Sequence, residues 1–297
     1  MRIIACPGQG SQSEGFLSPW IDNVPGFREQ LEQLGKAANR DLVSLGTTAS
    51  EETIKDTSNA QPLIVGASIA AYRTSLATDR FDAVVGHSVG EFAAAAIAGI
   101  LSDEEAMRLV SVRADAMAAA AAEVETSMAA VLGGDSAEVL AELEARGLHA
   151  ANFNGAGQIV AAGEKGLIAD LVSNPIPGTR CIELKVAGAF HTRFMEPAVA
   201  VLREAALSVK VNDPVIAIYS NQLGQRIDSG KEFLDLMVNQ VANPVRWDLC
   251  MANLDSEGSQ LIELPPAGAL AGLAKRGMPN STAVAIKTPH DLEKLGS

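Results

Sequence analysis

The amino-acid sequence predicts an α/β fold that consists of a mostly parallel sheet with helices around it. A smaller ferredoxin-like unit is inserted into this larger one. Short apolar runs that end at Gly or Pro alternate with longer stretches of helical periodicity, which is the pattern of an α/β core. Runs such as Ala83-Val84-Val85 are apolar at successive positions, which indicates strands buried on both faces of a parallel sheet. Residues from about 127 to 186 follow a separate order, β-α-β-β-α-β, typical of a ferredoxin-like unit.

The larger unit is predicted from the segments on both sides of that insertion. Its strands are expected at Arg2–Cys6, Phe81–Val85, Val215–Tyr219, Gln260–Leu264 and Ala283–Lys287. Its clearest helices are expected at 60–78 and 103–123. The second helix opens with Ser102-Asp103-Glu104-Glu105, a capping box with acidic residues in the first turn. We therefore assign residues 1–126 and 187–297 to a large α/β subdomain.

The insertion, residues 127–186, is predicted to form a small subdomain of its own. Strands are expected at 128–132, 150–153, 158–162 and 180–185, and helices at 136–146 and 165–173. The two middle strands are joined through Asn154-Gly155-Ala156-Gly157, residues that favour a tight turn. The junction between two such units is a common place for a ligand-binding cleft.

The composition limits the partners and surroundings that the chain can have. Its formal net charge of −13 argues against a general binder of nucleic acid or of membrane surfaces, which are themselves anionic. Neither a signal peptide nor an apolar run of about 18 residues is recognised. The three cysteines, Cys6, Cys181 and Cys250, lack metal-ligand spacing and are expected to be buried and unpaired. We therefore expect a soluble cytoplasmic protein without a metal site.

A serine nucleophile is predicted at position 88. The strand that ends at Val85 runs into Gly86-His87-Ser88-Val89-Gly90, and a helix-like stretch follows at once. This is the G-x-S-x-G elbow in the strand–turn–helix context that it requires, in which the glycines leave room for a sharp turn. The start of the helix directs free N–H groups toward an oxyanion that forms there. A plain strand-to-helix turn is the alternative interpretation.

A serine hydroxyl needs a general base at neutral pH, and the sequence contains four histidines. His87 is adjacent to Ser88, but adjacent side chains diverge on a tight turn, so we assign it a structural or orienting role at the substrate site. His149 and His290 lie in polar stretches and are expected to be solvated. His191 lies where the chain leaves the insertion, at the expected cleft, and is the predicted base. A core histidine with satisfied hydrogen bonds is the alternative.

Arg113 is predicted to be a buried cation. The residues three and four positions away from it on its helix are all apolar: Leu109, Val110, Ala116 and Met117. Burying a guanidinium without an anion is costly, so Arg113 needs a partner. That partner is either an internal Asp or Glu, or a substrate carboxylate held by two parallel hydrogen bonds.

Five motifs, in order along the chain, resemble one known family. They are Pro7-Gly8-Gln9-Gly10-Ser11-Gln12, Gly86-His87-Ser88-Val89-Gly90-Glu91, Arg113, Gly188-Ala189-Phe190-His191 and Gln240-Val241-Ala242-Asn243-Pro244-Val245-Arg246-Trp247. Together they resemble malonyl-CoA:acyl carrier protein transacylases and the related acyltransferase domains of polyketide synthases, over nearly the whole chain. The resemblance implies an α/β-hydrolase-like core with a ferredoxin-like insert, in agreement with the pattern above.

The resemblance implies a role for each residue that matches. Ser88 would carry the acyl group, and His191 would be its base. The backbone N–H groups of Gln9 and Val89 would form the oxyanion hole. Arg113 would bind the malonyl carboxylate.

Three further positions match with less direct roles. Gln240 occupies the position whose backbone carbonyl orients the histidine, in place of the acid of a hydrolase. Gln61 matches a segment near the acyl pocket, and Phe190 resembles malonyl-selective rather than methylmalonyl-selective members. One departure is Pro265-Pro266-Ala267, which stands where many members have Gly-Pro-Gly and leaves the conformation of that loop open.

These residues predict ping-pong transfer of malonyl from malonyl-CoA to the phosphopantetheine thiol of acyl carrier protein, through a malonyl ester on Ser88. The pathway would be fatty-acid or polyketide synthesis, no cofactor is implied beyond the coenzyme A thioester substrate, and a monomer is expected. Because acyl carrier protein is acidic, we expect a basic rim at the cleft, with the candidates Arg180, Lys185, Arg193, Lys275 and Arg276. The alternatives are a serine hydrolase or thioesterase of the α/β-hydrolase type, and a non-catalytic carrier-binding subunit.

Overall fold

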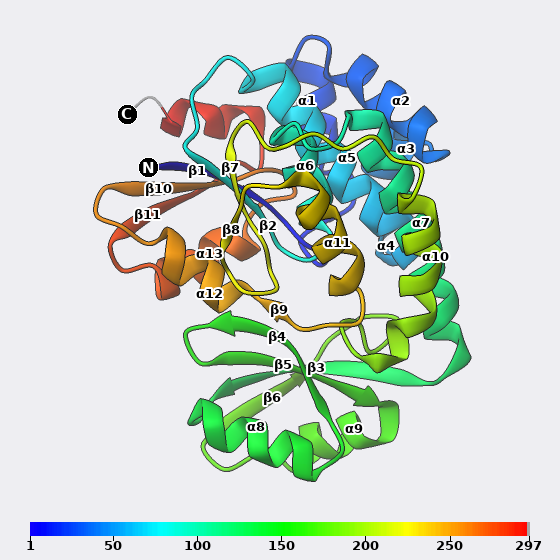
Figure 1. Ribbon diagram of the computed structural model, residues 1–297, viewed down its shortest axis with the longest axis vertical. Helices are drawn as coiled ribbons and strands as arrows, with labels where there is room; N and C mark the ends of the chain where they lie inside the picture. Colours follow the sequence, from blue (N-terminus) through cyan, green and yellow to red (C-terminus); the bar gives the residue numbers. More distant parts are fainter. Residues whose placement is uncertain (296–297) are drawn as a thin grey trace.

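The computed structural model describes residues 1–295, which form two β-sheets and the helices around them (Figure 1). The larger sheet has the strand order β11-β10-β1-β2-β7-β8. Its strands are β1 (Arg2–Cys6), β2 (Ala83–Gly86), β7 (Ala217–Tyr219), β8 (Arg226–Ile227), β10 (Ser259–Glu263) and β11 (Ser281–Ala285). Neighbouring strands are parallel except for β8, which is antiparallel to β7. The predicted α/β fold class is confirmed.

Helices cover both faces of the larger sheet. The helices of this part of the chain, some of which pack only on other helices, are α1 (Ser18–Asn23), α2 (Phe27–Ala38), α3 (Leu42–Thr47), α4 (Glu51–Lys55), α5 (Thr57–Ser75), α6 (Gly90–Ile97), α7 (Asp103–Glu123), η1 (Arg193–Met195), α10 (Glu196–Ala206), α11 (Gly230–Gln240), α12 (Trp247–Leu254), α13 (Ala269–Gly277) and η2 (Pro289–Leu295). In β1, Ile4 packs in a cluster with residues of α5, α6 and α7, whereas Ile3 packs in a cluster with residues of α12 and α13. Burial on both faces explains why these strands are continuous apolar runs.

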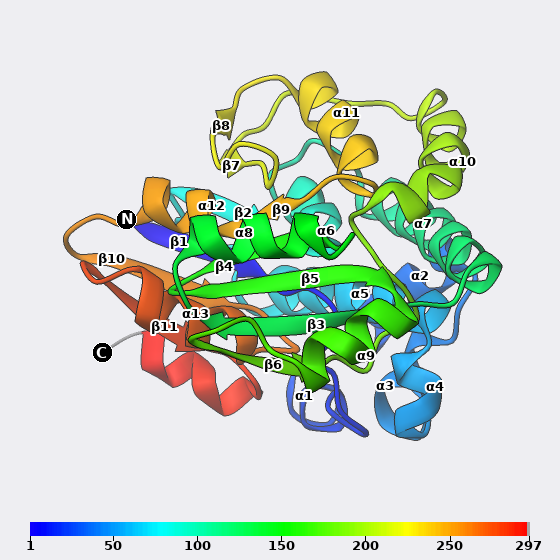
Figure 2. The same ribbon diagram turned by 90° about the horizontal axis from the view of Figure 1, so that it is seen from below.

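The smaller sheet lies beside the larger part and has the order β6-β3-β5-β4-β9. Its elements are β3 (Thr126–Gly133), α8 (Ser136–Ala145), β4 (His149–Gly155), β5 (Gln158–Glu164), α9 (Lys165–Ser173), β6 (Thr179–Glu183) and, from much later in the chain, β9 (Val245–Arg246). Strands β3 to β6 pair antiparallel, and β9 pairs parallel to β4. Helices α8 and α9 cover one face of this sheet, seen at the bottom of Figure 1 and in front of the sheet in Figure 2. A core cluster of its own lies between them and the sheet.

Some predicted bounds shift by two or three residues. Helix α5 begins at Thr57 rather than residue 60, because the Asp56 side chain accepts the Ser58 N–H and caps the helix there. Strand β11 lies two residues earlier than expected, because Ser281–Ala285 is the segment in register with β10. The two-residue strands β8 and β9 were not expected, since so short a segment carries no periodic signal.

The segment Pro265-Pro266-Ala267 connects β10 to α13. Its Pro265–Pro266 peptide bond is cis, and the Ser68 hydroxyl donates a hydrogen bond to the Pro265 carbonyl at 2.9 Å. Just before it, the buried Glu263 carboxylate accepts N–H groups from the start of α13, among them that of Leu270 at 2.9 Å. This carboxylate therefore caps α13 from inside the protein.

Two expectations from composition can be compared with the structure. Cys6, Cys181 and Cys250 are buried and unpaired, as expected. Within residues 1–295, no helix combines the length and the apolar character needed to cross a membrane.

Candidate active site

Ser88 lies at the tip of a sharp turn between β2 and α6. Its φ of +52° is left-handed, which is uncommon for a residue with a Cβ. A Cβ at Gly86 would lie 2.2 Å from the backbone N of Glu91. A Cβ at Gly90 would lie 2.2 Å from the carbonyl oxygen of Cys6. Both flanking positions therefore require glycine, and the tight turn brings the predicted nucleophile to the carboxyl edge of the sheet.

The His191 imidazole contacts the Ser88 hydroxyl. Its Nε2 lies 2.7 Å from Ser88 Oγ, and its Nδ1 lies 2.9 Å from the backbone carbonyl oxygen of Gln240. A carbonyl oxygen only accepts hydrogen bonds, so Nδ1 carries the proton and Nε2 accepts from the hydroxyl. Burial and the nearby Arg113 charge lower the pKa of His191 to about 3, so the imidazole is neutral at pH 7.

Arg113 reaches the same hydroxyl from α7. It is 1% exposed, as its apolar helix face predicts. Its Nη1 donates to Gln61 Oε1 at 2.6 Å, and its Nη2 donates to Ser88 Oγ at 3.2 Å. Nη2 also donates to Gln240 Oε1 at 3.2 Å. In the described part of the chain, Arg113 forms no ion pair with an acidic side chain, and its Nε has no acceptor.

Two backbone N–H groups beside Ser88 are available to a ligand. Strands β1 and β2 are adjacent and parallel, so the loop after β1 and the elbow after β2 meet at one sheet edge. Among residues 1–295, the N–H groups of Gln9 and Val89 have no hydrogen-bond acceptor. The Ser88 N–H, in contrast, already donates to Asn221 Oδ1 at 2.7 Å. Free donors beside a nucleophile are the parts of an oxyanion hole.

One cavity of about 180 Å³ brings the predicted groups together. Its lining includes Gln9, Gln61, His87, Ser88, Val89, Arg113, Phe190 and His191. The smaller sheet supplies another part of its wall, so the cavity lies at the junction of the two sheets, where a cleft was expected. Gln240 is not part of the lining and acts on the site through His191 and Arg113.

The other histidines differ in their surroundings. His87 lies beside the Trp247 ring, and its Nε2 is 3.1 Å from Asn154 Oδ1, which fixes its orientation in the cavity wall. Burial lowers the pKa of His87. His290 is exposed, as expected. The expectation that His149 is solvated is wrong: the residue begins β4, is half-buried and packs edge-on against Phe194 at 6.3 Å.

Sequence reasoning missed two residues behind the cavity, Glu91 and Asn221. They are 1% and 0% exposed. Glu91 Oε1 accepts the Asn221 N–H at 2.7 Å, and Asn221 in turn holds the Ser88 N–H. A signal for Glu91 existed, because it is the one polar residue in the run 89–101. Asn221 carried no such signal, because asparagine is common in loops.

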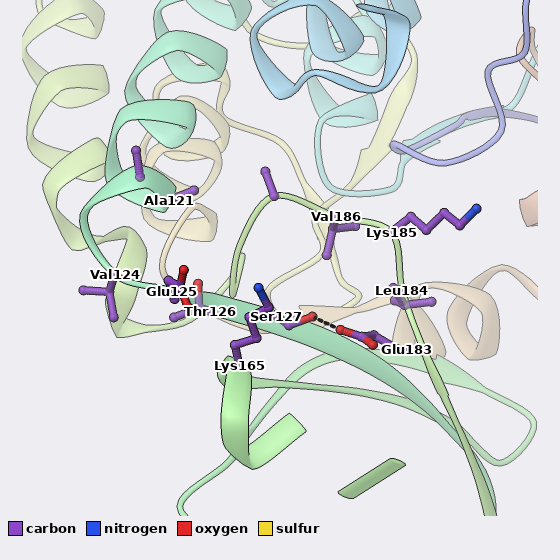
Figure 3. A pocket seen from close by; sticks show the side chains of 12 residues that line it. Ala121, Val124, Glu125, Thr126, Ser127, Lys165, Glu183, Leu184, Lys185 and Val186 are labelled. Carbon is purple, nitrogen blue, oxygen red and sulfur yellow. Dashed lines mark hydrogen bonds between the residues drawn. The ribbon is translucent and has the colours of Figure 1, made fainter. Parts of the chain in front are cut away.

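A larger hollow of about 610 Å³ adjoins the cavity (Figure 3). Leu184 and Val186 line both spaces. The hollow lies between the C-terminal end of α7, the start of β3 and the segment that leaves β6, where the Ser127 hydroxyl donates to Glu183 Oε1 at 3.0 Å. Leu184 and Val186 therefore form a wall that the cavity shares with this larger hollow.

The candidates for a basic rim are all exposed, but they lie in different places. Lys185 lines the hollow of Figure 3. Arg193 lines a third hollow, also of about 610 Å³, to which His191 contributes. The remaining three, Arg180, Lys275 and Arg276, are not among the residues that line either hollow.

Comparisons with known proteins agree with this geometry. A family model described as an acyl transferase domain matches residues 4–289. The malonyl CoA-acyl carrier protein transacylase of Mycobacterium tuberculosis strain H37Rv is 45% identical over 302 residues, covering 100% of both chains.

Solved structures give the same result. The crystal structure of MCAT from Mycobacterium tuberculosis superposes with a TM-score of 0.94 at 46% identity, covering 100% of this chain and 99% of that one. A structure of a type II PKS acyl-carrier protein in complex with its malonyl-transacylase superposes with a TM-score of 0.93 at 27% identity, covering 99% of this chain and 98% of that one. The resemblance inferred from the five motifs is therefore confirmed, and this chain belongs to the acyl transferase family and, within it, to the malonyl CoA-acyl carrier protein transacylases.

Proposed function

We propose that this protein is an acyltransferase that moves malonyl from malonyl-CoA to the phosphopantetheine thiol of acyl carrier protein, for fatty-acid or polyketide synthesis. The observation that carries the proposal is the single cavity in which Ser88 Oγ lies 2.7 Å from His191 Nε2 and 3.2 Å from Arg113 Nη2. A nucleophile, a neutral base and a buried cation around one small space suit an acyl group that carries a carboxylate.

In the first half-reaction, His191 Nε2 takes the Ser88 proton while Oγ attacks the thioester carbonyl. The resulting oxyanion is held by the N–H groups of Gln9 and Val89, each contributing roughly 2.7–4 kcal/mol. The C–S bond then breaks, the proton on His191 passes to the coenzyme A sulfur, and malonyl remains on Ser88. The carbonyl of Gln240 keeps the imidazole in the required tautomer throughout.

In the second half-reaction, the carrier thiol gives its proton to His191 as its sulfur attacks the Ser88 ester. The C–O bond breaks, the proton returns to Ser88 Oγ, and malonyl leaves on the carrier. These steps need neither a metal nor a redox cofactor.

Selectivity for malonyl is proposed to come from Arg113. Its guanidinium lines the cavity, is buried and forms no ion pair within residues 1–295, so a substrate carboxylate can serve as its anionic partner. Gln61 holds one end of the guanidinium in place. Phe190 limits the width of the cavity, and His87 forms a fixed part of its wall.

We also propose the division into subdomains that the sequence predicts, residues 1–126 with 187–297 and residues 127–186. The order β6-β3-β5-β4, with α8 and α9 on one face, supports a ferredoxin-like small unit. The elbow at the edge of a parallel sheet supports an α/β-hydrolase-like core. Hydrogen exchange tests the division: residues 127–186 are expected to exchange as one cooperative unit.

The surroundings of the enzyme follow from its substrates and charge. Exposed Lys185 and Arg193 are the best-placed contacts for an acidic carrier. The net charge of −13 supports the proposal that nucleic acids and membranes are not partners. Unpaired buried cysteines support a cytoplasmic location. We propose a monomer, which sedimentation equilibrium would test.

The deciding experiment mixes the protein with malonyl-CoA and acyl carrier protein, and follows free malonate and malonyl-carrier together. Malonyl-carrier is expected, with a malonyl adduct on Ser88 that is absent from Ser88→Ala. Rapid malonate release without transfer would indicate a serine hydrolase instead. Absence of any adduct in the wild-type protein would indicate a non-catalytic carrier-binding subunit.

A further inference from the structure

A chain of buried polar side chains lies behind the cavity, in contact with the proposed machinery but not with the substrate space. Its members are Glu91, Asn221 and Gln240, which are 1%, 0% and 3% exposed. Buried polar groups are costly unless each hydrogen bond is made, so the directions of these bonds are strongly constrained.

The orientation of Asn221 is fixed by two main-chain groups of the elbow. Its Oδ1 accepts the Ser88 N–H at 2.7 Å, and its Nδ2 donates to the Gly86 carbonyl oxygen at 2.7 Å. Rotating the amide by 180° would place a donor against an N–H and an acceptor against a carbonyl. Asn221 therefore presents an oxygen to its other neighbours.

The orientation of Gln240 follows from that of Asn221. Gln240 Nε2 lies 3.2 Å from Asn221 Oδ1, and it also donates to Glu91 Oε2. With both neighbours acting as acceptors, the Gln240 amide must turn its nitrogen toward them. Its Oε1 then faces Arg113 Nη2, at 3.2 Å. The reverse rotation would set an NH₂ group against the guanidinium, two donors face to face.

Glu91 is the carboxyl group at the end of this chain. Its Oε1 accepts the Asn221 N–H at 2.7 Å, and its Oε2 accepts from Gln240. Burial raises the pKa of Glu91 to about 8, while Asn221, the Arg113 charge and Ser220 act in the opposite direction. The Cys250 thiol on α12 also interacts with this carboxyl, and burial raises the pKa of that thiol.

We propose that Glu91 is a positioning residue: through the Gln240 side chain it fixes the Arg113 guanidinium beside Ser88, and in its ionised form it is a buried negative charge that competes with a substrate carboxylate for Arg113. The inference rests on the proposed transfer of malonyl. It gives Gln240 two separate tasks, since its carbonyl orients the base and its side chain orients the cation. One residue thereby sets the position of both groups around Ser88.

The competition between Glu91 and the malonyl carboxylate depends on pH. When Glu91 is neutral, the Arg113 charge acts fully on a malonyl carboxylate. When Glu91 is ionised, the two anions repel each other around one cation, and malonyl is held less well. Acetyl has no carboxylate, so its transfer does not depend on this equilibrium.

The experiment compares kcat/KM for malonyl-CoA and acetyl-CoA between pH 7 and pH 9.5. In the wild-type protein the malonyl-to-acetyl ratio is expected to fall roughly tenfold around pH 8, as one pKa unit of charge coupling gives. In Glu91→Gln the ratio is expected to be independent of pH. Glu263→Gln is the matched control, because Glu263 is a buried carboxylate that contacts α13 instead, and the pH dependence should persist in it.

A second variant tests the route through the amide. Gln240→Leu keeps the carbonyl that orients His191 and removes the contact to Arg113, so malonyl transfer should fall roughly tenfold to a hundredfold relative to acetyl. Wild-type protein that transfers malonyl with a ratio constant over this pH range would overturn the inference and leave the proposed function intact, even if Glu91→Gln does not fold. A wild-type protein that transfers no malonyl would refute the proposed function itself.

Discussion

Removing the Arg113 guanidinium is expected to abolish the preference for malonyl while leaving acyl transfer chemistry in place. In Arg113→Ala the malonyl carboxylate would enter a cavity with no cation, at a position that is only 1% exposed in the wild-type protein. A broken buried pair of this kind costs about 3–5 kcal/mol. Since 1.36 kcal/mol is a factor of ten in rate, kcat/KM for malonyl-CoA should fall roughly 10²–10⁴-fold.

Acetyl transfer should change far less in the same variant. Arg113 also donates to Ser88 Oγ at 3.2 Å, and loss of this one hydrogen bond is expected to lower kcat/KM for acetyl-CoA roughly tenfold. Arg113→Lys should lie between the wild type and the alanine variant for malonyl, because it keeps the charge without the planar fork. The assay is transfer to acyl carrier protein from both thioesters at one pH.

Arg108→Ala is the matched control, since Arg108 lies on the same helix at a partly exposed position and does not line the cavity. This substitution should change kcat/KM for neither thioester by more than about twofold. Equal losses for malonyl and acetyl in Arg113→Ala would refute the carboxylate clamp, because they would mean that Arg113 supports only the Ser88 chemistry.

Three further predictions concern stability and selectivity. His191 has a pKa of about 3 in the folded protein, below its ordinary value of 6.5, so its contribution to stability is complete above pH 6.5 and is lost toward pH 3. The free energy of unfolding of the wild type, measured with urea, should therefore fall more steeply than that of His191→Gln as the pH is lowered over this range, by up to about 1.4 kcal/mol per pH unit. Parallel curves of this free energy against pH for the two proteins would contradict the prediction. Gly90→Ala should lower Tm by several degrees because its Cβ meets the Cys6 carbonyl, whereas Gly166→Ala, with open space, should not. Phe190→Ser should raise methylmalonyl transfer relative to malonyl in a competition assay, and an unchanged ratio would show that Phe190 does not set cavity width.

Most of the fold was predictable because burial leaves a direct pattern in the sequence. Strands β1 and β10 were located within a residue of their observed bounds, since strands covered on both faces must be apolar at successive positions. The bounds of β11 and α5 were not predicted as closely. The position of β11 is set by its register with β10, and the start of α5 is set by a side-chain cap. Strand β9 exists only because a distant strand offers it a partner.

The residues of the site also fall into two groups, those that a local sequence pattern predicts and those that it does not. Ser88 and Arg113 were identifiable from local pattern, one as an elbow and the other as a charge on an apolar helix face. Gln240 needed the family resemblance, because its proposed role belongs to a backbone carbonyl that any residue possesses. Glu91 and Asn221 were missed, because their importance comes from contacts between segments about 130 residues apart, such as the Asn221 N–H to Glu91 bond.

The short strand β9 makes the two sheets mechanically dependent on each other. Val245 and Arg246 pair with Asn152 and Phe153 of β4, and the Arg246 guanidinium lies 4.6 Å from the centre of the Phe153 ring. The same stretch of chain begins, five residues earlier, with the glutamine that holds the imidazole. A displacement of the smaller sheet would therefore be transmitted to the segment that orients the base. The wall of the cavity and the position of the base are therefore linked through one stretch of backbone.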